Sequence, residues 1–196
     1  MLATVARPPI GRQHLFDAAR TELVRGNGVM ELSALTRRAG LSTGALYHHF
    51  GSKSGLLVAI YDGFYEDLRH STGDSHLPAE ADWGTRERER TRRFVGYHFA
   101  DPLAPILLNH AVLDPELTEL EAFYIQNLSD DAVDNIRRGQ ALGQLPAGIE
   151  PDSAGAFVIG GLRHGIAQQL RITPLPSPDQ ATERLWYLTA AALGIA

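Results

Sequence analysis

The chain has 196 residues, of which 44% are hydrophobic, and this is ample for the core of one medium-sized domain or of a small domain joined to a larger one. It has no cysteine, which excludes disulfide bonds and thiolate metal sites, and no apolar run of membrane-spanning length or secretion-signal pattern, so we expect a cytoplasmic protein with no membrane contact. A formal net charge of −5 argues against a nucleic-acid partner unless basic side chains are concentrated in one part of the chain.

Apolar residues recur at helical spacing along nearly the whole chain, and no alternating strand pattern stands out. The sequence therefore predicts an all-α fold of about nine helices. The first is expected over about residues 11–25, with Leu15, Ala19 and Leu23 on its buried side. Gly26-Asn27-Gly28 ends it, because glycine and asparagine tolerate left-handed backbone.

Two short helices follow in a helix-turn-helix arrangement. The first of them has three small or apolar side chains on one face: Leu32, Leu35 and Ala39. Gly40 ends this helix, and Ser42 is a suitable cap for the next. Leu46 and Phe50, four residues apart, are the buried pair of that next helix.

The remaining elements form a helical body behind this three-helix head. A fourth helix is expected from Lys53 to about Arg69, and residues 71–82 have the composition of a loop. Further helices are expected at about 83–100, 105–112, 115–142, 152–171 and 179–193. The last two are apolar, and small residues such as Gly161 and Gly165 allow close helix packing. Their surfaces are either buried within one subunit or partly covered by a second copy.

The charges are unevenly divided between head and body. Residues 1–60 carry seven basic side chains against three acidic ones, whereas residues 61–196 carry eleven against twenty. A basic head on an acidic body suits phosphate binding by the head, with repulsion between nucleic acid and the rest of the protein.

The helix-turn-helix stretch also carries a long, specific motif. It reads Ala39-Gly40-Leu41-Ser42-x-Gly44-x-Leu46-Tyr47-x-His49-Phe50 and continues with Lys53-x-x-Leu56-Leu57. With the preceding helices, from about Pro9 to Leu68, it resembles the DNA-binding domain of the TetR/AcrR family of transcriptional regulators. Two residues depart from the family pattern. Glu31 stands where a Ser or Thr usually caps the second helix and contacts phosphate, and Thr36 replaces a common alanine.

The resemblance implies a DNA-binding domain at residues 9–69, with the helix-turn-helix at about 31–50, and an effector-binding and dimerisation domain at residues 70–196. It further implies a bacterial homodimer joined through its last two helices, with a ligand cavity in the body. Two recognition helices would bind a palindromic double-stranded operator in successive major grooves. A small-molecule effector would release the DNA, most often from a repressor.

Seven residues are predicted to contact DNA: Ser42, Thr43, Gly44, Tyr47, His48, His49 and Lys53. Ser42 caps the recognition helix near phosphate, and Thr43 and Gly44 face the base edges in its first turn. Tyr47 and Lys53 are expected on phosphate, and His48 on a base or phosphate. His49 either contacts DNA or packs against a neighbouring helix.

Nine residues on the helices of the body are candidates for the effector site: His98, Phe99, Asn109, His110, Phe123, Tyr124, Asn127, Phe157 and His164. Polar groups among aromatic rings suit a mostly apolar effector held by a few hydrogen bonds. Ordinary core or surface placement is the alternative for each of them. The spacing of His98, Asp101 and His110 is not diagnostic of a metal site, so we predict neither a metal nor a cofactor.

Two other functions remain open at this point. A small all-α enzyme is one, although the sequence has no Gly-x-Ser-x-Gly elbow, phosphate loop, dinucleotide glycine pattern or His-Glu-x-x-His motif. The other is a helix-turn-helix regulator that has a filled body core and takes no small effector.

Overall fold

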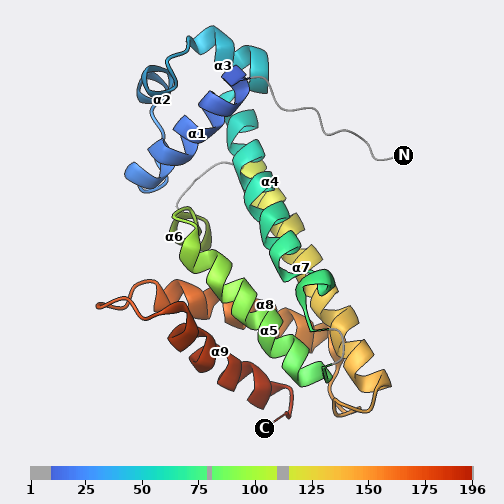
Figure 1. Cartoon of the computed structure of the whole chain (residues 1–196). Helices are drawn as coiled ribbons and strands as arrows, with labels where there is room; N and C mark the ends of the chain where they lie inside the picture. The colour runs from blue at the N-terminus through green and yellow to red at the C-terminus, as the bar shows by residue number, and fades with distance from the viewer. Residues whose placement is uncertain (1–9, 79–80, 110–114, 196) are drawn as a thin grey trace.

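The computed structural model describes residues 10–78, 81–109 and 115–195. Over these residues the chain forms nine α-helices, one 3-10 turn and no strand, which confirms the all-α prediction. The helices are α1 (Ile10–Arg25), α2 (Leu32–Ala39), α3 (Thr43–Phe50), α4 (Lys53–Thr72), α5 (Trp83–Ala100), α6 (Ala104–Leu108), α7 (Pro115–Ala141), α8 (Pro151–Gln169) and α9 (Pro178–Ala192). Helices α1–α3 form a head at one end of the molecule, and α4 leads from it into a body built from α5–α9 (Figure 1).

The head is held together by a few fully buried side chains. Leu15 of α1, Leu35 of α2 and Leu46 of α3 are all inaccessible to solvent and belong to the main hydrophobic core, together with the start of α4. The turn between α2 and α3 uses Gly40 at φ 66°, where an L side chain would be strained. These local features fix the angle between the two helices of the helix-turn-helix.

The body surrounds the second half of α4. Helices α5 and α7 pack against α4, α8 packs along α7, and α9 packs on α5 and α8. Three of the largest buried side chains among the described residues, Tyr61, Phe64 and Tyr65, come from α4. Because α4 starts beside α3 and ends in the middle of the body, it is the main structural connection between the two parts.

The expected boundaries differ from the observed ones in a few places. Helix α4 continues to Thr72, and a 3-10 turn at Asp74–His76 occupies part of the segment expected as a loop. The short helix expected at 105–112 is α6, and residues 110–112 lie outside the described part. None of the described helices combines the length and low polarity that a membrane-spanning segment needs.

Candidate functional site

The N-terminal turn of α3 is capped and open to solvent. The Ser42 Oγ accepts a hydrogen bond from the Ala45 amide at 3.3 Å, as expected for an N-cap. Thr43 and Gly44 are exposed, and a Cβ added at Gly44 would meet only the Ser42 Oγ, at 3.6 Å. Since nothing inside the chain requires glycine there, its effect is to leave the backbone of the first turn uncovered on its outer side.

The rest of α3 has one buried and one exposed face. Leu46 is fully buried and Phe50 is half-buried, with the guanidinium of Arg12 at 4.9 Å from the Phe50 ring centre. On the opposite face, Tyr47 is 53% exposed and His48 is exposed. The exposed side chains of α3 and its first turn therefore lie on a surface free to meet a partner.

His49 lies between these two faces. It is half-buried, and its Nε2 is 3.1 Å from the position that a Cβ at Gly11 would take. Its ring also contacts that of His48, with the two centres 5.0 Å apart. This close approach to the start of α1 favours the packing role of the two that the sequence left open.

Lys53 is the first residue of α4 and is exposed. The turn before it is fixed by Ser52, whose Oγ accepts a hydrogen bond from the Gly55 amide at 2.8 Å. Elsewhere in the head, Arg38 is paired with Glu22 at 2.5 Å. Glu31 precedes α2 without making a side-chain capping hydrogen bond, in keeping with its departure from the family pattern.

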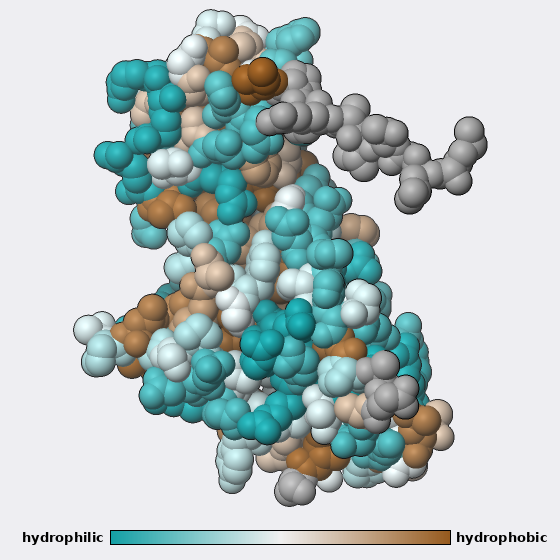
Figure 2. Space-filling model, in the orientation of Figure 1, coloured by the Kyte–Doolittle hydropathy of each residue, from teal (hydrophilic) through white to brown (hydrophobic). Residues whose placement is uncertain are grey.

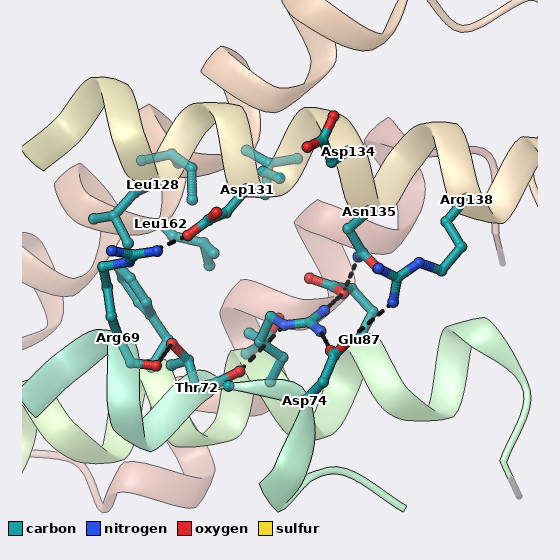
Figure 3. A pocket seen from close by; sticks show the side chains of 17 residues that line it. Arg69, Thr72, Asp74, Glu87, Leu128, Asp131, Asp134, Asn135, Arg138 and Leu162 are labelled. Carbon is teal, nitrogen blue, oxygen red and sulfur yellow. Dashed lines mark hydrogen bonds and ion pairs between the residues drawn. The ribbon is translucent and has the colours of Figure 1, made fainter. Parts of the chain in front are cut away.

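The body contains a cavity of about 400 Å³ between the end of α4 and helices α5, α7 and α8. Its floor is apolar and is formed by Phe94, Leu128, Val158, Ile159 and Leu162. Its rim is charged: Arg69, Asp74, Glu87, Arg90, Asp131, Asp134 and Arg138. Figure 3 shows Arg69 and Asp131 beside Leu128 and Leu162 at one end, and Asp74, Glu87, Asn135 and Arg138 at the other.

Most of these rim charges bond to one another. Asp74 accepts hydrogen bonds from Arg90 and, at 2.9 Å, from Arg138, and these bonds lower the pKa of the Asp74 carboxyl to about 2. Glu87 accepts from Arg90 at 2.6 Å and from Asn135. This network joins the segment after α4 to α5 and α7.

None of the described effector-site candidates from the sequence lines this cavity. His98 is fully buried, its Nδ1 lies 2.7 Å from the Phe94 carbonyl oxygen, and burial lowers the pKa of its imidazole to about 4. Tyr124 is buried and its hydroxyl donates to Asp62 at 2.8 Å. Phe99 and Asn127 are half-buried, and Phe123 is 59% exposed.

The other candidates are on the outside or undescribed. Asn109 is exposed and follows α6, and His110 lies outside the described residues. Phe157 and His164 are exposed on the outer face of α8. Tyr187 and Leu188 of α9 are likewise 74% and 63% exposed. The eight described candidates are therefore spread over the core and the surface and do not line one cavity.

Sequence reasoning missed the residues that line the cavity, because a dense Arg/Glu run such as the one at residues 86–93 is typical of the solvent-facing side of a helix. One signal was available: Glu87, Arg90, Thr91 and Phe94 recur at helical spacing and so share one face of α5. The rest of that run does form outward ion pairs, such as Arg92 with Glu89 at 2.7 Å. Figure 2 accordingly shows mainly hydrophilic side chains over the face of the body that presents α5.

The sequence is similar to known regulatory proteins. The family model for bacterial regulatory proteins of the tetR family matches residues 15–60. The HTH-type transcriptional regulator BetI of Burkholderia ambifaria (strain MC40-6) is 30% identical over 122 residues. This match covers 62% of the chain and 57% of the BetI protein, so it spans little more than half the length of that relative.

The fold is similar to solved structures over nearly the whole chain. A TetR-family regulator of Syntrophomonas wolfei superposes with a TM-score of 0.78 at 14% identity, covering 95% of this chain and 96% of that one. The SmeT–triclosan complex superposes with a TM-score of 0.71 at 21% identity, covering 94% of this chain and 91% of that one. The matched proteins are transcriptional regulators rather than enzymes, which argues against the enzyme alternative. The motif and the family model together show a tetR-family DNA-binding domain over residues 15–60, and the chain as a whole shares its fold with solved regulators of that family.

Proposed function

We propose that the protein is a homodimeric repressor that binds a palindromic operator through α3 of each subunit and releases it when a small, mostly apolar effector enters the body. The observation that carries the proposal is the division of α3. Leu46 anchors this helix in the head, while Thr43, Gly44, Tyr47 and His48 lie on its exposed side. A helix with this division is suited to the major groove.

Within this proposal the contacts have separate roles. Thr43 and Gly44 are nearest the base edges, because they form the exposed first turn of α3. Tyr47, one turn further on, and Lys53, at the start of α4, contact phosphate on the two sides of that turn. Ser42 orients the helix N-terminus toward phosphate. His49 supports α3 from behind through its contact with α1.

The exposed apolar face of α8 and α9 supports the homodimer. Phe157, Tyr187 and Leu188 are 67%, 74% and 63% exposed, which is a large apolar surface for one subunit to leave in water. Gly160 and Gly161 lie on the same side of α8 and have no atom within 4 Å of an added Cβ. Small residues flanked by aromatic ones allow the same helices of a second copy to approach closely in a two-fold interface.

The cavity supports an effector over the alternative of a filled body core. Its volume of about 400 Å³ lies within the range of small-molecule sites, and its apolar floor with a polar rim is typical of them. Arg69 and Thr72, on the rim, belong to α4, the helix that starts beside α3. A ligand that shifts α4 thereby changes the position of α3 and lowers the affinity for DNA. Bound DNA then lowers the affinity for the ligand by the same factor. SmeT, a structural relative, has been solved with triclosan.

Selection from a pool of random DNA duplexes tests this function. We expect the purified protein to enrich a palindrome whose half-sites lie about one helical turn apart, roughly 34–36 Å, since two α3 helices bind in successive major grooves. No enrichment, or enrichment of a single half-site with no symmetry, contradicts the proposal. The enriched duplex then serves for all the binding measurements below.

Substitutions at Lys53 and Tyr47 test the docking. Lys53→Ala is expected to weaken binding to every duplex and to reduce the salt slope by about one, because one phosphate contact is lost. Tyr47→Phe weakens binding to all sequences through loss of a hydroxyl, whereas Thr43→Val changes the preferred sequence. Arg88→Ala is the control, because Arg88 lies on α5, is as exposed as Tyr47, and pairs with Glu183 of α9. Unchanged affinity and slope for Lys53→Ala show that the docking is wrong.

A further inference from the structure

The arginines on the rim of the cavity differ in how fully their donors are used. Arg90 bonds to both Asp74 and Glu87, and Arg138 donates to Asp74 at 2.9 Å. Arg69 has only an ion pair with Asp131, at 3.4 Å, and its side chain makes no hydrogen bond within the described part of the chain. A guanidinium carries five N–H donors, of which Arg90 uses three, Arg138 uses one, and Arg69 uses none within the described part of the chain.

Arg69 also lies beside the apolar part of the cavity. Figure 3 shows its guanidinium next to Leu128 and close to Leu162, at the opposite end from the Asp74 network. A molecule that lies on the apolar floor therefore has its end beside Arg69. The planar fork of a guanidinium binds a carboxylate through two parallel hydrogen bonds.

The acidic groups of the rim offer a less suitable site for a cation. Asp74 and Glu87 already accept hydrogen bonds from arginine and asparagine side chains. The Asp134 side chain is 76% exposed and pairs with Arg137 outside the cavity. Asp131 is 60% exposed, so water can solvate it at small cost once it leaves Arg69.

We propose that the effector is an apolar acid, a molecule with a hydrocarbon or aromatic body and one carboxylate that takes the place of Asp131 on Arg69. The inference rests on the proposed function, because it names the chemical class of the effector of that same cavity. The body of the acid covers the floor formed by Phe94, Leu128 and Leu162. The carboxylate binds Arg69 at the rim, and Asp131 turns to solvent.

Calorimetry with matched sets of amphiphiles tests this assignment without DNA. The first set is decanoate, decanol and decylamine, and the second is hydrocinnamate, hydrocinnamyl alcohol and phenylpropylamine. We expect the acid of at least one set to bind at least about tenfold more tightly than its alcohol and its amine, as a charge-assisted hydrogen bond requires. If neither acid binds, or if the alcohol or the amine binds as well as the acid, the proposal is overturned.

Variants assign the effect to Arg69. Arg69→Gln is expected to lower the affinity for the acid by roughly ten- to a hundredfold and to leave the affinity for the alcohol unchanged. Asp131→Asn removes the competing carboxylate and is expected to raise the affinity for the acid by up to about fivefold. Arg137→Gln is the matched control, since Arg137 is 53% exposed against 50% for Arg69 and does not line the cavity. Equal losses for Arg69→Gln and Arg137→Gln, with both variants folded by thermal unfolding, contradict the assignment.

Failure of this inference is distinguishable from failure of the proposed function. The operator selection needs no ligand, and the calorimetry needs no DNA. An acid that binds through Arg69 but does not release the selected duplex leaves the ligand class intact and contradicts the effector role. A duplex that is selected while no acid binds leaves the regulator intact and contradicts the inference.

Discussion

Four buried polar side chains fix the body at the level of single residues. Arg163 of α8 donates to Glu121 of α7 at 2.6 Å and to the hydroxyl of Tyr65 on α4 at 3.0 Å. All three are nearly inaccessible to solvent, and burial raises the pKa of Tyr65 to about 12, so it remains a neutral hydroxyl. Removing Arg163 or Glu121 alone leaves an uncompensated buried charge, at a typical cost of about 3–5 kcal/mol.

His98 is the fourth, and it is buried without a charged partner. Its Nδ1 lies 2.7 Å from the Phe94 carbonyl oxygen, which places the proton of the neutral ring on this nitrogen. Its Nε2 has no hydrogen-bond partner within the described part of the chain. The rings of Phe64, Phe94 and Tyr97 surround it, so a positive charge there is poorly solvated.

The protein should lose stability when His98 becomes protonated in the unfolded chain. The pKa of His98 is lowered to about 4 by burial, against 6.5 for a free imidazole. The unfolded chain binds the proton first, so the contribution is fully present above pH 6.5 and is lost as pH falls toward 4. A difference of about 2.5 pH units amounts to roughly 3 kcal/mol.

Urea unfolding of wild type and His98→Asn across this pH range measures the effect. Asparagine keeps a donor for the Phe94 carbonyl and does not titrate. The wild type is expected to lose about 3 kcal/mol more than the variant between pH 6.5 and 4. Parallel curves for the two proteins would show that His98 is not the responsible group.

The sequence predicted the elements of the head well because each depends on local signals. Gly40 ends α2 in the left-handed region, Ser42 caps α3, and Leu46 with Phe50 sets its buried face. Each of these residues acts within one or two turns of its own position. The number and order of the helices in the body followed in the same way from periodicity and from prolines at helix starts.

The cavity was beyond such reasoning, because its residues come from four elements that meet only after folding. Arg69 and Leu162 are far apart in the chain and lie together on the cavity wall, and no local pattern connects them. Small residues on α8 were equally ambiguous. An added Cβ at Gly165 would lie 2.4 Å from the Leu185 side chain, whereas one at Gly161 meets nothing. The sequence predicted close packing by both glycines but not which of them faces α9.

The crossing of α7 and α8 depends on a glycine. An added Cβ at Gly155 would lie 2.6 Å from Val133 Cγ2 and 3.0 Å from the Ser129 carbonyl oxygen. Gly155→Ala is therefore expected to destabilise the protein by about 1–3 kcal/mol through overpacking, although alanine favours helix. Gly96→Ala on α5 is the control, because nothing lies within 4 Å of its added Cβ, and a gain of about 0.5–1 kcal/mol is expected.

Chemical denaturation of both variants measures the contrast. The prediction requires opposite signs for the two substitutions, since both replace a helical glycine by alanine and differ only in the space around the new methyl group. If both stabilise the protein, α7 can move away from α8 at little cost, and the close approach is not a constraint.

At the scale of the whole molecule, the head is connected to the body by more than α4. Arg20 of α1 pairs with Asp101 at 2.7 Å, and Asp101 also accepts the Leu103 amide at 2.9 Å. The Tyr97 hydroxyl donates to the Phe64 carbonyl of α4 at 2.9 Å. The end of α5 therefore contacts both the head and α4, and a rearrangement of the body can change the position of the head through either contact.

Dimerisation is the last requirement of the proposed function, and one substitution on α9 tests it. Leu188→Glu places a carboxylate in the apolar face formed by α8 and α9, and in a two-fold interface this charge is introduced twice. An uncompensated buried charge typically costs about 3–5 kcal/mol. Sedimentation should therefore give the variant a dimer dissociation constant at least about a hundredfold higher than that of wild type. Leu142→Glu is the matched control, because Leu142 is 60% exposed against 63% for Leu188 and lies beyond α7, outside this face.

Monomeric Leu188→Glu should keep the helix content of wild type and lose affinity for the full palindrome, since each α3 then binds one half-site alone. A Leu188→Glu protein that remains as dimeric as Leu142→Glu would place the subunit interface elsewhere.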